Sequence, residues 1–200
     1  MVAVYGQTDK LMLKQMVGES EIGYYSTATA LCSLWCFVLE AIIDSIVPSI
    51  MEAHNIDKSR FERLNKQLYC IVFYVSMGVS VLFTIFGGIA INLLYGEAYL
   101  PAVNPLRVAT WYIAFSYLGV ARNAWLVCEN KQRYLKYIYL IAAIANILLN
   151  LIFIPFFGAT GAAIASLISQ IMTSLVIPSF NKNMRQNAKL MVDAIFFRIR

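Results

Sequence analysis

The chain has 200 residues, of which 60% are hydrophobic and 14% are charged, with 16 Lys and Arg against 11 Asp and Glu. Soluble domains average about 45–50% apolar and about 25% charged residues, so this composition argues against a water-soluble globule. Disordered chains are poorer in hydrophobic residues and collagen needs glycine at every third position, which excludes both classes. The composition therefore predicts an integral membrane protein.

Six apolar segments follow one another along the chain, and a helix needs about 20 apolar residues to cross about 30 Å of hydrocarbon. The first, Met1 to Val17, is short and holds three charges, so it is predicted as a membrane helix or as a surface-lying amphipathic segment. Of the other five, the first is interrupted by Glu40 and Asp44, and the rest are uncharged except at Arg122. These five are Tyr24–Pro48, Leu68–Tyr95, Val108–Cys128, Tyr137–Phe157 and Ala162–Phe180.

The fold class predicted from these segments is all-α, a polytopic membrane helical bundle of about six transmembrane helices. The bundle covers residues 1–180 as one domain, because no loop is long enough for an independent soluble domain. Residues 181–200 are predicted to form a basic cytoplasmic tail, amphipathic if it is helical.

The basic residues predict an orientation, because Lys and Arg gather in short cytoplasmic loops. Twelve of the 16 lie in 53–67, in 131–136 or after Phe180, whereas the alternate loops 18–23, 96–105 and 158–161 contain none. Both ends of the chain are therefore predicted to be cytoplasmic. The net charge of +5 is interpreted as this topological bias, with attraction to anionic membrane lipids secondary and with no nucleic-acid partner.

Polar residues at membrane depth are the candidate functional residues, because a charge at the bilayer centre costs about 2.5–3.5 kcal/mol. At 100° per residue, one stripe about 60° wide on the second segment holds Ser26, Thr29, Ser33, Glu40 and Asp44. This face is predicted to turn away from lipid. On the first segment, Lys10 and Lys14 share a face with Gln7, and Asp9 lies about 100° to one side.

Two interpretations of these charges remain open. They pair in a structural network between helices, or they line a water-filled cavity that handles a charged cargo. Lys10 and Lys14 also have long stems that can extend to the membrane interface. The same applies to Arg122, which is predicted to lie only about 9 Å below the cytoplasmic end of its helix. Asn146 and Asn150, together with a stripe of small residues that includes Ser166, are interpreted as helix packing.

Enzyme chemistry is not predicted. Cys32, Cys36, Cys70 and Cys128 lie within apolar segments and lack the spacing of a zinc site, so no metal and no cofactor are expected. The single histidine, His54, is interpreted as a solvated loop residue. No loop offers clustered carboxylates or a nucleophile with a base, so catalytic residues are predicted to be absent.

Three stretches resemble a known family. The opening TDKLMLKQMVGESEIGYYSTA, the turn LLYGEAYLPAVNPLRVATW and the hairpin FGATGAAIASLISQ are similar to the C-terminal half of bacterial polysaccharide (O-antigen) flippases, which are related to multidrug and toxin extrusion exporters. The resemblance covers all six segments. It implies one half of a two-bundle transporter in the bacterial inner membrane. Its cargo would be an undecaprenyl-pyrophosphate-linked oligosaccharide for polysaccharide export, flipped by alternating access.

The resemblance also implies partners and roles. The chain begins within the region similar to the seventh helix, so we expect it to need an N-terminal bundle or a second copy of itself. Lys10, Lys14 and Arg122 would neutralise the pyrophosphate in a substrate cavity that also holds Asp9, Ser33, Glu40 and Asp44. The two carboxylates Glu40 and Asp44 would hold those cations when cargo is absent or bind a coupling proton. The alternatives are a cation-coupled multidrug-type antiporter and a truncated, noncatalytic membrane subunit.

Overall fold

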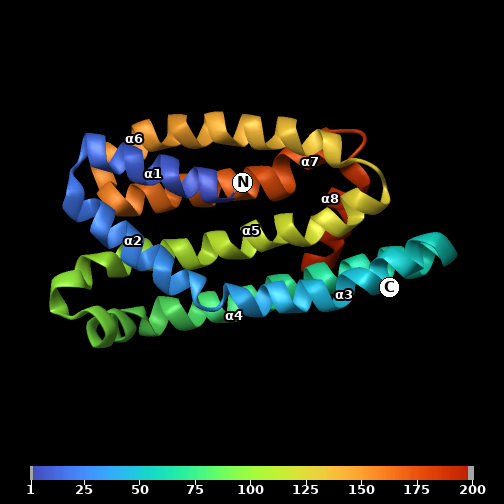
Figure 1. Cartoon of the computed structure of the whole chain (residues 1–200), viewed down its shortest axis with the longest axis horizontal. Helices are drawn as coiled ribbons and strands as arrows, with labels where there is room; N and C mark the ends of the chain where they lie inside the picture. The colour runs from blue at the N-terminus through green and yellow to red at the C-terminus, as the bar shows by residue number, and fades with distance from the viewer. Residues whose placement is uncertain (1, 198–200) are drawn as a thin grey trace.

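The computed structural model describes the backbone of residues 2–197 and the side chains of residues 7–197; Met1 and the last three residues of the predicted tail lie outside it. Every regular element in this range is helical. Figure 1 shows most of the helices packed side by side along one long axis. The prediction of an all-α, polytopic bundle is confirmed.

The bounds of the elements set where each turn lies. The α-helices are α1 (Val2–Met16), α2 (Glu19–Ser33), α3 (Cys36–Ile56), α4 (Lys58–Tyr95), α5 (Val103–Cys128), α6 (Leu135–Ile171), α7 (Ile177–Phe180) and α8 (Arg185–Ile195). Two short 3₁₀ elements, η1 (Glu97–Ala102) and η2 (Gln132–Tyr134), lead into α5 and α6, and a π-helical turn, η3 (Met172–Val176), leads into α7.

Three helical stretches of the described chain are long and apolar enough to cross a membrane: Glu19–Ile56, Lys58–Tyr95 and Gln132–Phe180. The 38 residues of α4 correspond to about 57 Å, which exceeds the hydrocarbon thickness by several turns. Its first turns carry Lys58, Arg60, Arg63 and Lys66, so the surplus length lies at the basic end of the helix.

The predicted helix Tyr24–Pro48 is two helices, because the chain breaks at Leu34 and Trp35 between α2 and α3. Side-chain groups compete for main-chain carbonyls around the break. The Ser33 hydroxyl donates to the Ala30 carbonyl at 2.7 Å, and the Cys36 thiol lies 3.4 Å from the Cys32 carbonyl. Such local hydrogen bonds weaken the helical pattern and bend helices.

The predicted hairpin between Tyr137–Phe157 and Ala162–Phe180 is present inside α6, which reverses at Gly158 (Figure 1). Gly158 has φ 53° and ψ −130°, a conformation essentially restricted to glycine. A Cβ atom there would collide with the Glu21 carboxylate, which accepts a hydrogen bond from the Ala159 amide at 2.7 Å. Glu21 therefore caps the second arm of α6, with its charge at the positive end of that helix.

Helix α5 is the central helix of the bundle, because it buries 14 of its 26 residues. This position explains why it can carry polar side chains such as Thr110, Ser116 and Arg122: its neighbours shield it from lipid. It packs against α2, α3, α4 and α6.

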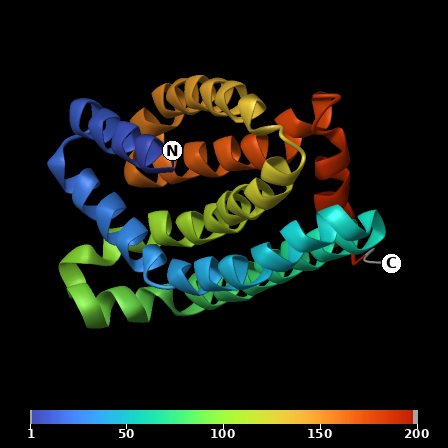
Figure 2. The same cartoon turned by 45° about the vertical axis from the view of Figure 1, so that its right-hand side comes forward.

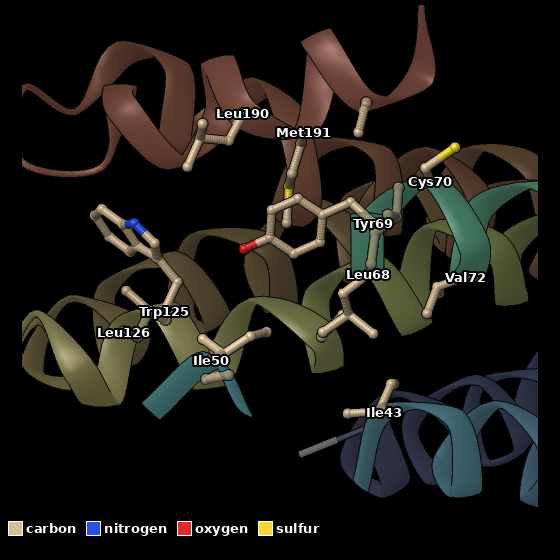
Figure 3. Packing of buried hydrophobic residues seen from close by; sticks show 14 of the residues in the cluster. Ile43, Ile50, Leu68, Tyr69, Cys70, Val72, Trp125, Leu126, Leu190 and Met191 are labelled. Carbon is tan, nitrogen blue, oxygen red and sulfur yellow. The ribbon is translucent and has the colours of Figure 1, made fainter. Parts of the chain in front are cut away.

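Helix α8, within the predicted basic tail, lies across the end of the bundle instead of along it (Figure 2, red). The Asn187 amide donates to the Tyr69 hydroxyl at 2.7 Å, and the Lys66 ammonium lies 3.4 Å from the Asp193 carboxylate. Leu190 and Met191 belong to the apolar cluster that Figure 3 shows around Tyr69 and Trp125. Helix α8 is thus amphipathic, and its apolar face packs against α4.

Replacing Gly158 with alanine is expected to destabilise the fold by about 2 kcal/mol, because the backbone conformation excludes a side chain and the new methyl group displaces Glu21. Thermal unfolding of the purified protein in detergent, followed by tryptophan fluorescence, measures the loss. Gly78→Ala, inside α4 with no atom near its Cβ position, is the control and should not lower the melting temperature. Equal melting temperatures for the two variants would contradict the role given to Gly158.

Candidate functional site

Asp9 is the centre of a polar cluster in the interior of the bundle, where its side chain is 0% exposed. Its carboxylate accepts hydrogen bonds from the Tyr25 hydroxyl at 2.7 Å, the Asn150 amide at 2.6 Å and the Ser166 hydroxyl at 2.6 Å. Asn146 accepts from the Asn150 amide at 3.3 Å. These donors come from α2 and from both arms of α6, so the carboxylate of α1 joins four helical segments.

The partners of Asp9 are neutral. Lys10 follows Asp9 in the sequence, yet none of the ion pairs found within residues 7–197 includes Asp9. A buried charge without a counterion is expensive, and three short hydrogen bonds are the means by which this cluster accommodates it. The Oδ1 atom of Asn150 is buried next to the carboxylate without a hydrogen-bond partner. The cluster therefore holds a buried carboxylate by hydrogen bonds alone and leaves one amide oxygen beside it without a donor.

The interpretation of Asn146, Asn150 and Ser166 as helix packing is incomplete. Asn150 and Ser166 donate directly to Asp9, and Asn146 lies 3.5 Å from the Ser166 hydroxyl. Two amides one turn apart on an otherwise apolar helix could have indicated this cluster from the sequence, because a carboxylate at membrane depth needs hydrogen-bond donors from a neighbouring helix. Only the fold shows that the neighbour is α1.

The cations of α1 lie apart from the Asp9 cluster. Lys10 is half-buried, and Lys14 is exposed with its ammonium 3.4 Å from the Glu19 carboxylate at the start of α2. No ion pair of the described residues joins either lysine to Glu40 or Asp44. Within residues 7–197, the ion pairing between helices that was considered from the sequence is limited, for these lysines, to Lys14 and Glu19.

Ser33 and Glu40 line a cavity of about 340 Å³ beside the break between α2 and α3. The Tyr117 hydroxyl of α5 donates to Glu40 Oε1 at 2.9 Å, and Thr29, Tyr112 and Ser116 complete the polar part of the wall. Asp44 lies one turn beyond Glu40 on α3 and is exposed. The structure therefore brings Ser33 and Glu40 together and leaves Asp44 outside this cavity.

One side of the bundle exposes polar residues at membrane depth. The exposed residues of α4 and of the first arm of α6 are large and apolar in the membrane-crossing region, as Ile85, Ile89, Leu140 and Leu148 illustrate. Helices α1, α2 and α3, on the side of the bundle facing the viewer in Figure 1, expose polar residues among apolar ones such as Leu11, Phe37 and Val38. The exposed polar residues include Gln7, Lys14, Ser33, Glu40 and Asp44. We call this side the polar face.

Arg122 does not extend to the interface, because it is 0% exposed in the interior. Its Nη1 atom donates to the Thr173 carbonyl at 2.9 Å, within the π-helical turn of the second arm of α6. It belongs neither to the cavity beside Glu40 nor to the Asp9 cluster. The described residues contain no group of three or more His, Cys, Asp and Glu that could hold a metal ion.

Long apolar helices around an internal carboxylate, with one polar face, define a polytopic membrane protein. The chain belongs to the polysaccharide biosynthesis protein family, whose model matches residues 1–104.

Two relatives extend the match over 86% of the chain. It is 21% identical over 174 residues to the capsular polysaccharide biosynthesis protein CapF of Staphylococcus aureus, covering 44% of that protein. It is 27% identical over 181 residues to the probable flippase AglR of Haloferax volcanii, covering 37% of it. The chain thus spans less than half the length of these curated relatives. No solved structure matches it.

Single cysteines introduced into a variant lacking the four native ones test whether the polar face is wet in the membrane. Ser33→Cys and Glu40→Cys are expected to react with a charged, membrane-impermeant maleimide, because their side chains line an open cavity. Leu148→Cys, on the apolar surface of α6, is the control and should stay unlabelled. If all three positions label equally poorly, the polar face lies against hydrocarbon.

Proposed function

We propose that the protein is a flippase, a transporter and not a catalyst, that moves a lipid-linked oligosaccharide of the undecaprenyl-pyrophosphate type across the bacterial inner membrane for polysaccharide export. The proposal is supported by the family match and by the names of the two relatives, one of which is a probable flippase. In this proposal the basic loops face the cytoplasm, so both ends of the chain are cytoplasmic.

The polar face is the observation that carries the proposal. A membrane protein that only packs against lipid has no use for Ser33, Glu40 and a cavity of about 340 Å³ on an exposed surface. A sugar chain, in contrast, needs hydroxyl, carboxylate and aromatic groups along a wet path. Thr29, Tyr112 and Ser116 supply such groups in the same wall.

A path of this kind needs a second wall. We propose that a second helical bundle, an N-terminal one or one from a second copy of the chain, covers the polar face and encloses the path. Transport by alternating access then consists of rocking the two bundles about the enclosed cargo, which carries the binding site to one side of the membrane and then the other.

In this proposal the two lysines of α1 bind the cargo, and Asp9 couples transport to a proton. Lys10 and Lys14 attract the anionic pyrophosphate at the edge of the polar face, where screening is weaker than in bulk water. Asp9 serves as the coupling group. As a carboxylate it accepts all three hydrogen bonds, whereas a protonated Asp9 also donates one, so that at least one of its partners must turn to accept it.

Proton uptake would therefore loosen the contact of α1 with α2 and with both arms of α6. A conformational change needs a ligand that binds the two states differently, and this change in hydrogen bonding supplies the difference. The cation carried by the cycle is then a proton taken up from one side and released to the other.

Asp9→Asn is expected to lower the rate of lipid-linked oligosaccharide transport in proteoliposomes by about tenfold or more, because the amide cannot change its charge. Asp193→Asn, the same change at the half-buried ion pair between α8 and Lys66, is the matched control and should transport at the normal rate. Thermal unfolding establishes that both variants are folded. An unaltered rate for folded Asp9→Asn would remove Asp9 from the coupling step.

A cation-coupled multidrug-type antiporter is the second candidate, favoured by Glu40 beside Tyr112 and Tyr117, since a carboxylate with aromatic rings suits an organic cation. Proteoliposomes loaded separately with a lipid-linked sugar and with a cationic dye distinguish the candidates. We expect flipping of the sugar and no export of the dye. Export of the dye alone would favour the antiporter, and transport of neither would favour a noncatalytic subunit.

A further inference from the structure

Helix α8 crosses α4 at the level where the charged turns of α4 give way to its apolar stretch (Figure 2). Near the start of α8, the Gln186 amide donates to the Glu62 carboxylate at 2.9 Å. Near its end, the Ile195 carbonyl accepts from the Tyr74 hydroxyl at 2.7 Å. Tyr74 lies about 9 Å past Leu68, where the uncharged stretch begins. The start of α8 is therefore at the level of the lipid headgroups, whereas its end reaches the edge of the hydrocarbon.

The side of α8 that faces away from the bundle changes from basic to apolar in the same direction. Arg185 and Lys189 are exposed in the first half of the helix. Val192 is 40% exposed in the second half, and Phe196, directly after the helix, is 69% exposed. Spacings of four, three and four residues place these four side chains on one face, which we call the basic-aromatic stripe. Its cations thus lie at headgroup level and its apolar side chains at the edge of the hydrocarbon.

The charge of the basic-aromatic stripe is positive. Asp193, the single acidic residue of α8, lies to one side of the stripe, with its carboxylate 3.4 Å from the Lys66 ammonium. The ion pairs found within residues 7–197 include neither Arg185 nor Lys189. Lys182, in the turn before α8, adds another exposed cation. A partner that complements this face is anionic at one end and apolar at the other.

The opposite face of α8 holds the helix on the bundle. This face is apolar and packs against α4. The Asn187 amide donates to the Tyr69 hydroxyl at 2.7 Å, and the rings of Phe197 and Tyr74 stack with their centroids 4.5 Å apart. The basic-aromatic stripe is therefore presented by an anchored helix, which lowers the entropy cost of binding a partner.

We propose that the basic-aromatic stripe binds anionic phospholipid, with Arg185 and Lys189 against the phosphate groups and with Val192 and Phe196 among the upper parts of the acyl chains. Cations beside large apolar side chains are the arrangement by which a helix binds in the plane of the interface. Lys and Arg at the membrane surface attract anionic lipid, whereas a zwitterionic bilayer complements the apolar half alone. A soluble protein is disfavoured as the partner, because the aromatic end lies beside Tyr74 at the level of the hydrocarbon. This surface is separate from the polar face.

The depth of the stripe is tested with the environment-sensitive dye nitrobenzoxadiazole on single cysteines, in a variant without the four native ones. The natural gene product, with any sequence that flanks residues 1–200, is reconstituted into vesicles of phosphatidylcholine and phosphatidylglycerol. We expect a dye at Phe196→Cys to emit at shorter wavelength than one at Arg60→Cys, which is exposed near the start of α4. Emission from both positions at the wavelength of a water-exposed dye would overturn the proposal.

The preference for anionic lipid is measured on a dye at Val192→Cys, quenched by nitroxide-labelled phosphatidylglycerol or phosphatidylcholine at the same mole fraction. We expect phosphatidylglycerol to quench about twofold more strongly, because the cations enrich it around the stripe. Arg185→Gln combined with Lys189→Gln should abolish this difference. Lys58→Gln combined with Arg60→Gln removes the same charge from the basic end of α4 and should leave the difference unchanged.

The substituted cations of α8 are exposed, so the packed face of the helix is retained, and an unchanged melting temperature checks this. Sodium chloride at about 0.5 M provides a second measurement on the protein with Arg185 and Lys189 intact, because salt screens exposed charges and should remove the difference. Equal quenching by the two lipids at low salt would overturn the proposal. So would a difference that persists without Arg185 and Lys189, or one that is lost equally in the control variant.

Discussion

A carboxylate inside a bilayer must find its hydrogen-bond donors within the protein, and the arrangement of the bundle follows from this constraint at Asp9. Its three donors come from α2 and from the two arms of α6, which fixes α1 against segments that are far apart in the chain. The reversal at Gly158 brings Asn150 and Ser166 to the same level of the membrane, so the cluster depends on the hairpin. Glu21, which caps the second arm, fixes that hairpin to α2.

The second arm of α6 and the π-helical turn η3 that continues it contact both buried charges. Ser166 donates to Asp9, and the Thr173 carbonyl accepts from Arg122 about two turns further along. The π-helical turn at Met172–Val176 coincides with the second contact, where the helical hydrogen bonding is already altered. A shift of this arm that accompanies a change at Asp9 would therefore move the acceptor of Arg122. The two sites are connected through one continuous helical segment.

The features that could be predicted from the sequence are those that depend on the length of the apolar segments and on the residues of the turns. The hairpin at Gly158, the apolar part of α4 from Leu68 onward and the basic residues of the alternate loops follow from apolar runs, glycines and charge counts. The first ten residues of α4, residues 58–67, were predicted as a loop and are helical. The break at Leu34 was not predictable, because it depends on hydroxyl and thiol groups competing for carbonyls within an otherwise continuous apolar pattern. The Asp9 cluster was half predictable: the carboxylate stood out, whereas its partners lie 16 to 157 positions away and only the packing brings them together.

The neutrality of the Asp9 partners bears on what the cluster can do. Had a lysine occupied the position of Asn150, the pair would hold its charges in every state, because separating or neutralising a buried ion pair is costly. Hydroxyl and amide donors stabilise the carboxylate less than a lysine would. They can also pair with a protonated carboxyl group, since a hydroxyl also accepts a hydrogen bond. In the proposed transport cycle, the same group could then exchange a proton, with a different hydrogen-bond pattern before and after. A carboxylate that stays charged does not need partners that can also accept a hydrogen bond. The neutral donors therefore favour the proposed proton exchange at Asp9 over a role in helix packing alone.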